Sequence, residues 1–553
     1  MGEIEAPLGA GSRGTGTPES AVLDEAHLGD IEGAFGRIRQ DDGESSRTWK
    51  RRLLTLLAIL GPGIIVMVGD NDAGGVATYA QAAQNYGLAL LWTLPLLIPV
   101  LIVNQEMVVR LGAVTGVGHA RLINERFGKF WGAFSVGDLF VLNFLTLVTE
   151  FIGVDLGLSY FGVSPVVSVP LAAVGLFAMA TTGSFRRWER FMFVFILTSL
   201  LMFPLAALAH PHLGPVVSGT VVPRVTGGFD ATAVLFIIAI VGTTVAPWQL
   251  FFQQSNVVDK RITTRFLRYE LADTVIGAVL TNVGAAALIV ATAFAFARSH
   301  LAGHFASSLA VAQGLASRVS PLAGDLFAVI LINAAILGAS AVTLSTSYAL
   351  GDSFGVKHSL HRKVTDAKAF YASFAALVAL AAGIVLIPGA PLGLMTTGVQ
   401  VLAGVLLPSA IVFLLLLCND AAVLGPWVNT TRQNVVASLI VAVLVLLSLI
   451  LTITTVFPAI AFGPLVASLA ALGAVGLGVL GLSARRRRDG RLAPEPSDAT
   501  RARRDTWRMP ALALLAPPVW SAQRKLGLLA LRAYLVVAVV LLAVKIAQVA
   551  VGG

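Results

Sequence analysis

The chain has 553 residues, of which 56% are hydrophobic and only 12% are charged. Soluble domains carry about 25% charged residues, so this composition excludes a soluble protein and indicates one that crosses a membrane repeatedly. The net charge is +9, and the one cysteine, Cys418, excludes an intrachain disulfide bond.

In chain order, residues 1–50 come first and are polar, with many Gly, Ser, Asp and Glu residues. They lack the apolar core of a cleavable signal peptide. A segment of this composition buries too little apolar surface to fold on its own. We therefore expect a disordered N-terminal tail.

Apolar stretches long enough to span a bilayer, which requires about 20 residues, recur from Leu53 to Leu482. The sequence predicts twelve spans, near 53–84, 88–113, 131–157, 165–183, 190–209, 231–257, 270–297, 322–350, 366–387, 394–418, 433–454 and 458–482. A basic linker follows over 484–525. A candidate thirteenth span lies in 526–553, where Arg532 and Lys545 interrupt the apolar run. We predict an all-α polytopic membrane protein.

Basic residues are distributed unequally between the loops. The loops after even-numbered spans carry basic clusters at 121–129, 186–190, 260–268 and 357–368, whereas the opposite loops offer only Arg224, Arg298 and Arg318. Loops rich in Lys and Arg remain in the cytoplasm, so the pattern predicts a multi-pass protein of the cell membrane with a cytoplasmic N-terminus. Topology thereby accounts for the positive charge, and nucleic-acid binding is not indicated.

An acidic residue lies inside the first apolar segment. Asp72 follows Asp70 and Asn71 and precedes Gly74 and Gly75. A carboxylate at membrane depth costs roughly 2.5–3.5 kcal/mol or more, so by default it marks a solute or ion pathway. Glycine is a poor helix former, and a helix that unwinds there frees backbone carbonyls as ligands. This pattern is typical of a cation site.

The sixth apolar segment contains a second interruption, at 242–248. Pro247 removes a backbone donor and clashes with the preceding turn, so the helix must kink or unwind nearby. One such kink alone is more often structural than functional. Two breaks five segments apart, one of them bearing Asp72, instead favour a transporter site between five-plus-five inverted repeats.

These motifs resemble the Nramp family of divalent metal-ion transporters, from Leu56 to Asn434. The family's helix-one motif Asp-Pro-Gly-Asn is matched by 72–75, its helix-six motif Ala-Thr-Val-Met-Pro-His by 243–248, and its helix-ten glutamine by Gln400. The resemblance implies a LeuT-like fold with repeats over 51–229 and 230–418 and extra helices over 419–483. It also implies a transporter rather than an enzyme, with no cofactor apart from the transported cation.

The resemblance implies a ligand set residue by residue. The family's helix-one Asp and Asn correspond to Asp72 and Gly75, its helix-six Met and carbonyl to Ala246 and the carbonyl of Thr243, and its helix-ten Gln to Gln400. The amide and the sulfur are therefore both absent. Thioether suits transition metals, whereas oxygen and water suit Mg²⁺, which retains several waters. The pattern is similar to that of the Nramp-related magnesium transporters.

Three further residues are candidate ligands beside this set. Asp70 and Asn71 could bind the ion through waters, although Asp70 could equally cap the unwound turn. The hydroxyl of Thr244 lies beside the second break and is a candidate oxygen ligand or water partner.

Proton coupling is not supported by the matching positions. The family's proton route uses an Asp, a Glu and a His. Here the Glu is matched by Glu150, but Leu147 stands at the position of the Asp and Trp248 at that of the His. A proton relay needs a chain of titratable groups, so we expect potential-driven Mg²⁺ uptake. Glu150 could equally be a structural partner in the bundle. A proton-coupled Mn²⁺ or Fe²⁺ transporter remains the alternative.

A function of another class is also open. A sodium-coupled organic solute carrier could use the same fold, but Asp72 would repel the carboxylate of a substrate such as an amino acid. The expected partners are thus a divalent cation and the lipid bilayer, and the sequence indicates no obligate protein partner. Extramembrane segments show no nucleophile–base pair that would indicate an enzyme.

Overall fold

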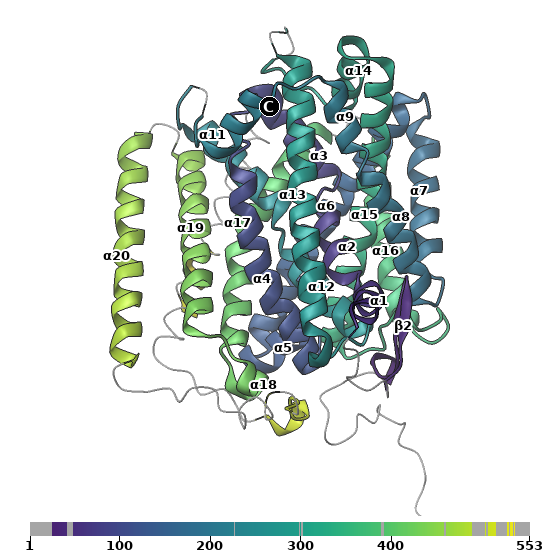
Figure 1. The fold of residues 1–553 in the computed structure, drawn as a ribbon, viewed down its shortest axis with the longest axis vertical. Coiled ribbons are helices and arrows are strands. Elements are labelled where there is room, and N and C mark those ends of the chain that lie inside the picture. The colour runs from purple at the N-terminus through teal and green to yellow at the C-terminus, as the bar shows by residue number, and fades with distance from the viewer. Residues whose placement is uncertain are drawn as a thin grey trace, which may run out of the picture.

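A computed structural model describes residues 25–40 and 48–488, apart from positions 226, 298, 300, 301, 389–391, 458 and 459, together with short pieces between 504 and 536. Within these residues the protein is a helical bundle (Figure 1). Nine of the described helices or helix pairs are long and apolar enough to cross a membrane, or ten if the bent pair of the first two helices is one span.

Each of the twelve predicted spans coincides with one or more helices. The unbroken ones are α4 Thr93–Thr115, α6 Lys129–Tyr160, α7 Pro165–Ala180, α13 Leu267–Phe296, α15 Pro321–Phe354, α16 Lys368–Val385, α17 Leu392–Cys418, α19 Thr431–Val456 and α20 Phe462–Arg488. The fifth span is divided into α8 Phe185–Ser199 and α9 Met202–Leu208. Most of the candidate thirteenth span lies outside the described residues.

Shorter helices mark the two ends of the bundle (Figure 1). One end, here called the α5 end, carries α5 His119–Phe127 and α18 Ala421–Leu424, which is followed by the turn η3 Gly425–Trp427. The opposite end, here called the α14 end, carries α14 Ser308–Arg318 and α9. Other short elements are α10 Leu213–Val221, η2 Thr264–Phe266 and η4 Leu512–Leu514.

Close helix packing brings the centre of the bundle together. α6 packs along α15, and α13 packs against the first and second spans. A Cβ built on Gly153 of α6 would lie 2.2 Å from the Cβ of Ala73, so only glycine allows this approach. Small residues serve this purpose generally in membranes, where burial alone does not drive helices together. In contrast, α19 and α20 lie along one flank, with α20 outermost (Figure 1).

Both predicted helix interruptions are present. The first span consists of α1 Trp49–Ile59, α2 Pro62–Gly69 and α3 Ala73–Tyr86; α1 and α2 meet at 51°. Asp72 caps α3, because its Oδ1 accepts a hydrogen bond of 2.6 Å from the backbone N–H of Gly75. This is the ordinary role of Asp at a helix start.

The sixth span consists of α11 Ala231–Thr244 and α12 Pro247–Asp259. Pro247 is the first residue of α12, where its missing N–H costs no helical hydrogen bond. The backbone between the two helices, at Val245 and Ala246, is extended or irregular and buried. The proline therefore ends one helix and begins the next, as the sequence predicts.

Part of the segment expected to be a disordered tail is folded. It forms η1 Glu25–His27 and the antiparallel hairpin of β1 Ile31–Gly33 and β2 Gly36–Ile38. Ile31 and Ala34 are buried, since the hairpin packs on α1 and α8. The average composition of residues 1–50 is polar, and it does not indicate a folded hairpin of eight residues within them. Residues 1–24 and 41–47 lie outside the described part.

Described pieces of the predicted linker over 484–525 also contact the bundle. The indole N–H of Trp427 donates to the carbonyl of Arg504 at 2.9 Å, and the guanidinium of Arg504 lies over the Trp427 ring. Trp507 packs against Gly425, where a Cβ would overlap its ring. Beyond the linker, the hydroxyl of Tyr534 donates to the carbonyl of Val405 at 2.6 Å.

Candidate metal-ion site

The two interrupted spans and α17 meet around Gly74 and Gly75. A Cβ built on Gly75 would lie 2.9 Å from the carbonyl oxygen of Asp70, 2.9 Å from Oγ1 of Thr243 and 3.3 Å from Oδ1 of Asp72. A Cβ on Gly74 would overlap the side-chain amide of Gln400 and lie 3.3 Å from the same Asp72 oxygen. Carboxylate, carbonyl, hydroxyl and amide groups therefore pack closely around the two glycines.

Several polar side-chain atoms of the residues around Gly74 and Gly75 have no hydrogen-bond partner among the described residues. They are both carboxylate oxygens of Asp70, Oγ1 of Thr243 and Nε2 of Gln400. Asp70, Asp72 and Thr243 are each at most 2% exposed. Buried polar groups are normally hydrogen-bonded, and a dry, unpaired carboxylate is costly. These atoms therefore fit a role in holding a cation or its waters.

Gln400 reaches the site from α17, where it is 3% exposed. Its amide nitrogen faces Gly74 and lacks a partner among the described residues. A half-turn of the terminal amide exchanges nitrogen for oxygen, so this side chain can also present an acceptor. It therefore joins the third element of the site to the two broken spans.

Asp70 and Asn71 make different contacts. Asp70 offers its backbone carbonyl to the space beside Gly75, and its carboxylate lies within electrostatic range of Asp72. Asn71 turns toward α13, where its Nδ2 donates to the carbonyl of Thr281 at 2.9 Å. Asn71 thereby ties the unwound segment to α13, a role that sequence spacing did not indicate.

The second break contributes fewer ligand atoms than the first. Ala246 is the buried residue before α12, and its methyl group offers no lone pair. The hydroxyl of Thr244 is already engaged, because it donates to the carbonyl of Ile240 at 2.7 Å and lies 2.8 Å from the hydroxyl of Tyr79. Of the two threonines, only Thr243 has an unpartnered hydroxyl among the described residues.

Glu150 lies next to Asp72. Its Oε2 accepts a hydrogen bond of 3.0 Å from the backbone N–H of Ala73, the first residue of α3. A Cβ built on Gly338 of α15 would lie 2.7 Å from Cβ of Asp72 and 2.8 Å from Oε2 of Glu150. Glu150 thus supports the start of α3, and its carboxyl group is close enough to Asp72 to interact with it directly.

The other two positions of the family's proton route are apolar or aromatic here. Leu147 and Trp248 are both buried, and the backbone carbonyl of Trp248 accepts a hydrogen bond of 3.0 Å from Ser345. Glu150 therefore has no titratable neighbour at either of these two positions.

Tyr79 was not identified from the sequence. It lies on α3 one helical turn after Gly75 and is fully buried. The spacing of four residues, which places two side chains on one helix face, is the signal that could have found it.

Among the described residues, no three or more His, Cys, Asp and Glu side chains are grouped so that they could hold a metal ion. The polar groups around Gly75 instead combine one carboxylate, of Asp72, with two neutral oxygens, of Asp70 and Thr243. Such a mixed, weakly charged set is suited to an ion that must also leave.

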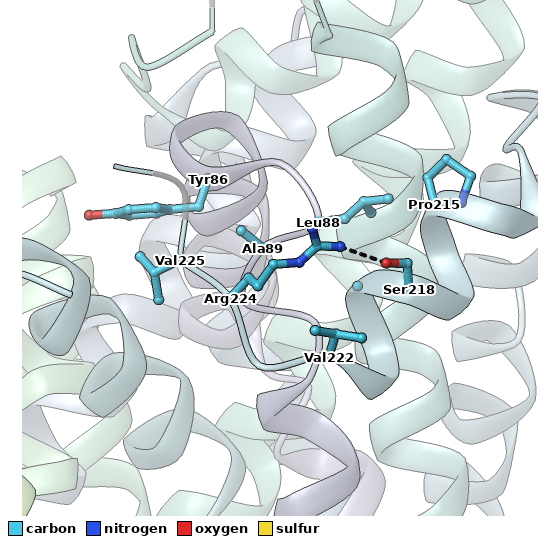
Figure 2. Close-up of a pocket in the computed structure, with 9 residues that line it drawn as sticks. Tyr86, Leu88, Ala89, Pro215, Ser218, Val222, Arg224 and Val225 are labelled. Atoms are coloured by element: carbon cyan, nitrogen blue, oxygen red, sulfur yellow. Dashed lines mark hydrogen bonds between the residues drawn. The ribbon is translucent and has the colours of Figure 1, made fainter. Parts of the chain in front are cut away.

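A surface pocket lies elsewhere, beyond the C-terminal end of α3 (Figure 2). It is lined by Tyr86, Leu88, Pro215 and Val222, and by Arg224, whose Nη2 donates to Oγ of Ser218 at 2.7 Å. Tyr86 follows Gly75 by eleven residues, or about 16 Å along a helix. This pocket contains none of the candidate ligands.

Two facing interrupted helices with a buried carboxylate at the break define a polytopic membrane transporter of the LeuT-like inverted-repeat class. Residues 63–454 match the model of the Nramp family, described as natural resistance-associated macrophage protein-like. The chain therefore belongs to the Nramp family. This confirms the resemblance and the expectation of a transporter rather than an enzyme.

Individual relatives agree with this assignment. The chain is 28% identical over 418 residues to the divalent metal cation transporter MntH of Bacillus subtilis, covering 72% of this chain and 93% of that protein. It is 30% identical over 412 residues to the MntH of Ralstonia nicotianae, covering 72% of this chain and 90% of that protein.

Among solved structures, a manganese transporter of Eremococcus coleocola has a similar fold, with a TM-score of 0.60 and 21% identity. The match covers 81% of this chain and 98% of that one. The predicted fold class, an all-α membrane protein of LeuT-like architecture, is therefore confirmed.

Proposed function

We propose that the protein carries divalent cations across the membrane and that its main cargo is Mg²⁺ in a largely hydrated form. The arrangement around Gly75 carries this proposal: oxygens of Asp70, Asp72 and Thr243 come together at the one position of the break where the residue has no side chain to keep them apart. A carboxylate with neutral oxygens is the ligand set that a hard dication prefers.

The missing amide and sulfur support Mg²⁺ over Mn²⁺. Gly75 and Ala246 stand at the positions of the family's Asn and Met, and neither offers a side-chain ligand. Mg²⁺ sheds water reluctantly and is usually held through one or two carboxylates with several waters retained. A site with one central carboxylate and neutral oxygens close to it meets that requirement.

Uptake without a proton is the simpler mechanism for this site. Leu147 and Trp248 interrupt the route along which the family moves protons. An inside-negative potential contributes about 2.3 kcal/mol per charge per 100 mV, and thus roughly twice as much for a dication. Proton-coupled Mn²⁺ or Fe²⁺ transport is the second candidate, because Glu150 directly adjoins Asp72.

Under this proposal the N-terminus and the α5 end face the cytoplasm. Arg121 and Arg126 of α5 and the basic loop at 357–368 belong to that end, in keeping with the positive-inside rule. The direction of net transport then follows the membrane potential from the α14 end to the α5 end.

Flux measurements on purified protein in liposomes test the proposal. Asp72→Ala should lower Mg²⁺ flux about tenfold or more, because the charged ligand is lost. Ala246→Met should raise the preference for Mn²⁺ or Cd²⁺. Asp366→Ala, at an exposed loop position, is the matched control and should leave flux unchanged.

An entrapped pH dye in the same liposomes reports coupling. The proposal requires Mg²⁺ entry without acidification. Unchanged Mg²⁺ flux in the Asp72→Ala variant would overturn the ligand assignment. Strong Mn²⁺ entry with acidification would instead establish the second candidate.

A further inference from the structure

Tyr79 adjoins the proposed cation site on the side of the α14 end. It is 0% exposed and lies one turn beyond Gly75 on α3. Gly75 faces Thr243 and Tyr79 faces Thr244, so two neighbouring positions on α3 meet two consecutive residues at the end of α11. Tyr79 is also within electrostatic range of both Asp70 and Asp72.

The hydrogen bonds fix which atom of the pair donates. Thr244 uses its one hydroxyl hydrogen to donate to the carbonyl of Ile240 at 2.7 Å. The contact of 2.8 Å between Tyr79 and Thr244 must then have the phenol as donor. The phenol oxygen keeps its lone pairs, and it can accept one more hydrogen bond.

Waters bound to a cation need such acceptors. A water that coordinates Mg²⁺ through its oxygen points both hydrogens outward, so the surrounding protein must accept hydrogen bonds. The carbonyl of Asp70, the hydroxyl of Thr243 and the carboxylate of Asp72 are acceptors of this kind beside Gly75. Tyr79, one turn farther along the same helix, offers a further acceptor in its phenol oxygen.

We infer that Tyr79 is a specificity-determining residue, which accepts a hydrogen bond from a water retained by the cation and thereby favours hydrated Mg²⁺. This rests on the proposed function. Loss of the phenol oxygen weakens binding of an ion that keeps its waters more than binding of an ion that sheds them. A purely structural tie between α3 and α11 would instead affect all ions alike.

Two variants of the full chain separate these roles. Tyr79→Phe removes the acceptor, whereas Thr244→Val breaks the same hydrogen bond but keeps the phenol. In liposomes, Tyr79→Phe should raise the KM for Mg²⁺ about two- to tenfold and change the KM for Mn²⁺ less. Thr244→Val should alter the ratio of the two KM values little.

Equal effects of the two variants on both ions would overturn the inference, as would an unchanged KM for Mg²⁺ in Tyr79→Phe. The wild type and Asp72→Ala are measured in parallel. If the wild type carries no Mg²⁺, the proposed function fails and the inference fails with it. If Asp72→Ala abolishes flux while Tyr79→Phe changes nothing, the inference alone fails.

A second inference concerns the N-terminal hairpin, which lies outside the residues that match the family. The backbone N–H of Ala34 donates to Oε2 of Glu189, and its carbonyl accepts from Nε of Arg190 at 3.1 Å. Arg261, after α12, donates to the carbonyls of Ala26 at 2.9 Å and Asp30 at 3.0 Å. The hairpin is thus bound to both α8 and the end of α12.

The same hairpin packs against α1. A Cβ on Gly33 would overlap the carbonyl of Ala58, so the strand and the helix are in direct contact. In addition, Nζ of Lys260 donates to the carbonyls of Ile59 at 2.7 Å and Leu60 at 2.8 Å. The end of α1 is therefore held between the hairpin and α12.

The geometry points to a clamp: the hairpin of residues 25–38 holds α1 against α8 and α12, and its release permits α1 to swing away from the bundle. The bend of 51° between α1 and α2 is the hinge about which such a motion would occur. Transporters of this architecture work by motion of one group of helices against another.

Spin labels on α1 and α13 test the clamp. The exposed Leu54 and Arg268 are each replaced by cysteine in a Cys418→Ser background and spin-labelled. The distance between the two labels is measured by double electron–electron resonance. Deletion of residues 1–40 should add a population with a longer distance, whereas deletion of residues 1–24 keeps the hairpin and should add none. Identical distributions in the two deletions would overturn the clamp.

Discussion

Oε2 of Glu150 accepts a hydrogen bond of 3.0 Å from the backbone N–H of Ala73, the residue that follows Asp72. A carboxyl group on α6 therefore satisfies an otherwise free donor at the start of α3 and fixes the position of Asp72 beside it. Because the two carboxyl groups also interact, one residue can serve both the fold and the charge state of the site.

Two substitutions of Glu150 should separate these roles. Glu150→Gln keeps an acceptor for Ala73 and should leave thermal stability and Mg²⁺ flux near the wild-type values. Glu150→Ala leaves a buried donor unsatisfied, which costs about 1–3 kcal/mol. Stability is measured by thermal unfolding in detergent, and Mg²⁺ flux is measured by uptake into liposomes. A complete loss of flux in Glu150→Gln would instead favour an essential proton on Glu150.

Gly75→Ala should close the space proposed for the cation. The new Cβ would lie 2.9 Å from both the carbonyl of Asp70 and Oγ1 of Thr243. These contacts are too short, so the site must distort, and we expect Mg²⁺ flux to fall about tenfold or more.

Gly383→Ala is the matched control for this prediction, because a Cβ at that position of α16 meets no atom within 4 Å. It should preserve flux, and it should stabilise its helix by about 0.5–1 kcal/mol. Wild-type flux in Gly75→Ala would contradict the view that the ion occupies this space.

The parts of the site that could be predicted from the sequence are those with a local signal. Pro247 and the glycines after Asp72 mark the two helix breaks, since they disfavour helix whatever surrounds them. Gln400 was found through its place in a motif. Each of these expectations depends on a few neighbouring residues.

The remaining features depend on contacts between distant segments. Asn71 bonds to Thr281, 210 residues away, and Tyr79 bonds to Thr244, 165 residues away. No periodicity within one helix reveals such a pair. The hairpin at 31–38 was missed for a related reason, because its stability comes from packing on α1 and α8 and not from its own composition.

A buried ion pair joins α8 to the end of α12. Nζ of Lys260 lies 2.6 Å from Oε1 of Glu189, and both side chains are 0% exposed. Lys260→Met should destabilise the protein by about 3–5 kcal/mol, because it leaves Glu189 buried without its countercharge.

The double variant Lys260→Met with Glu189→Gln should be less destabilised than the sum of the single variants. The double-mutant cycle compares the wild type, the two single variants and the double variant by thermal unfolding in detergent. Additive effects would contradict a direct coupling between the two side chains.

His358 should make stability depend on pH. Burial opposes its charge, but its Nε2 lies 3.1 Å from Oδ1 of Asp352 and its Nδ1 2.7 Å from the carbonyl of Val356, and these contacts raise its pKa to about 9. Since the pKa in the unfolded chain is about 6.5, the stabilisation is complete below that pH and is lost as the pH rises through about 9.

The size of this effect follows from the difference between the two pKa values, and it is at most about 3 kcal/mol. Thermal unfolding of the wild type from pH 6 to pH 10 should therefore show a decline that His358→Gln lacks, because glutamine carries no charge to lose. Parallel pH profiles of the two proteins would show that His358 is neutral in the folded chain, and that its contact with Asp352 is an ordinary hydrogen bond.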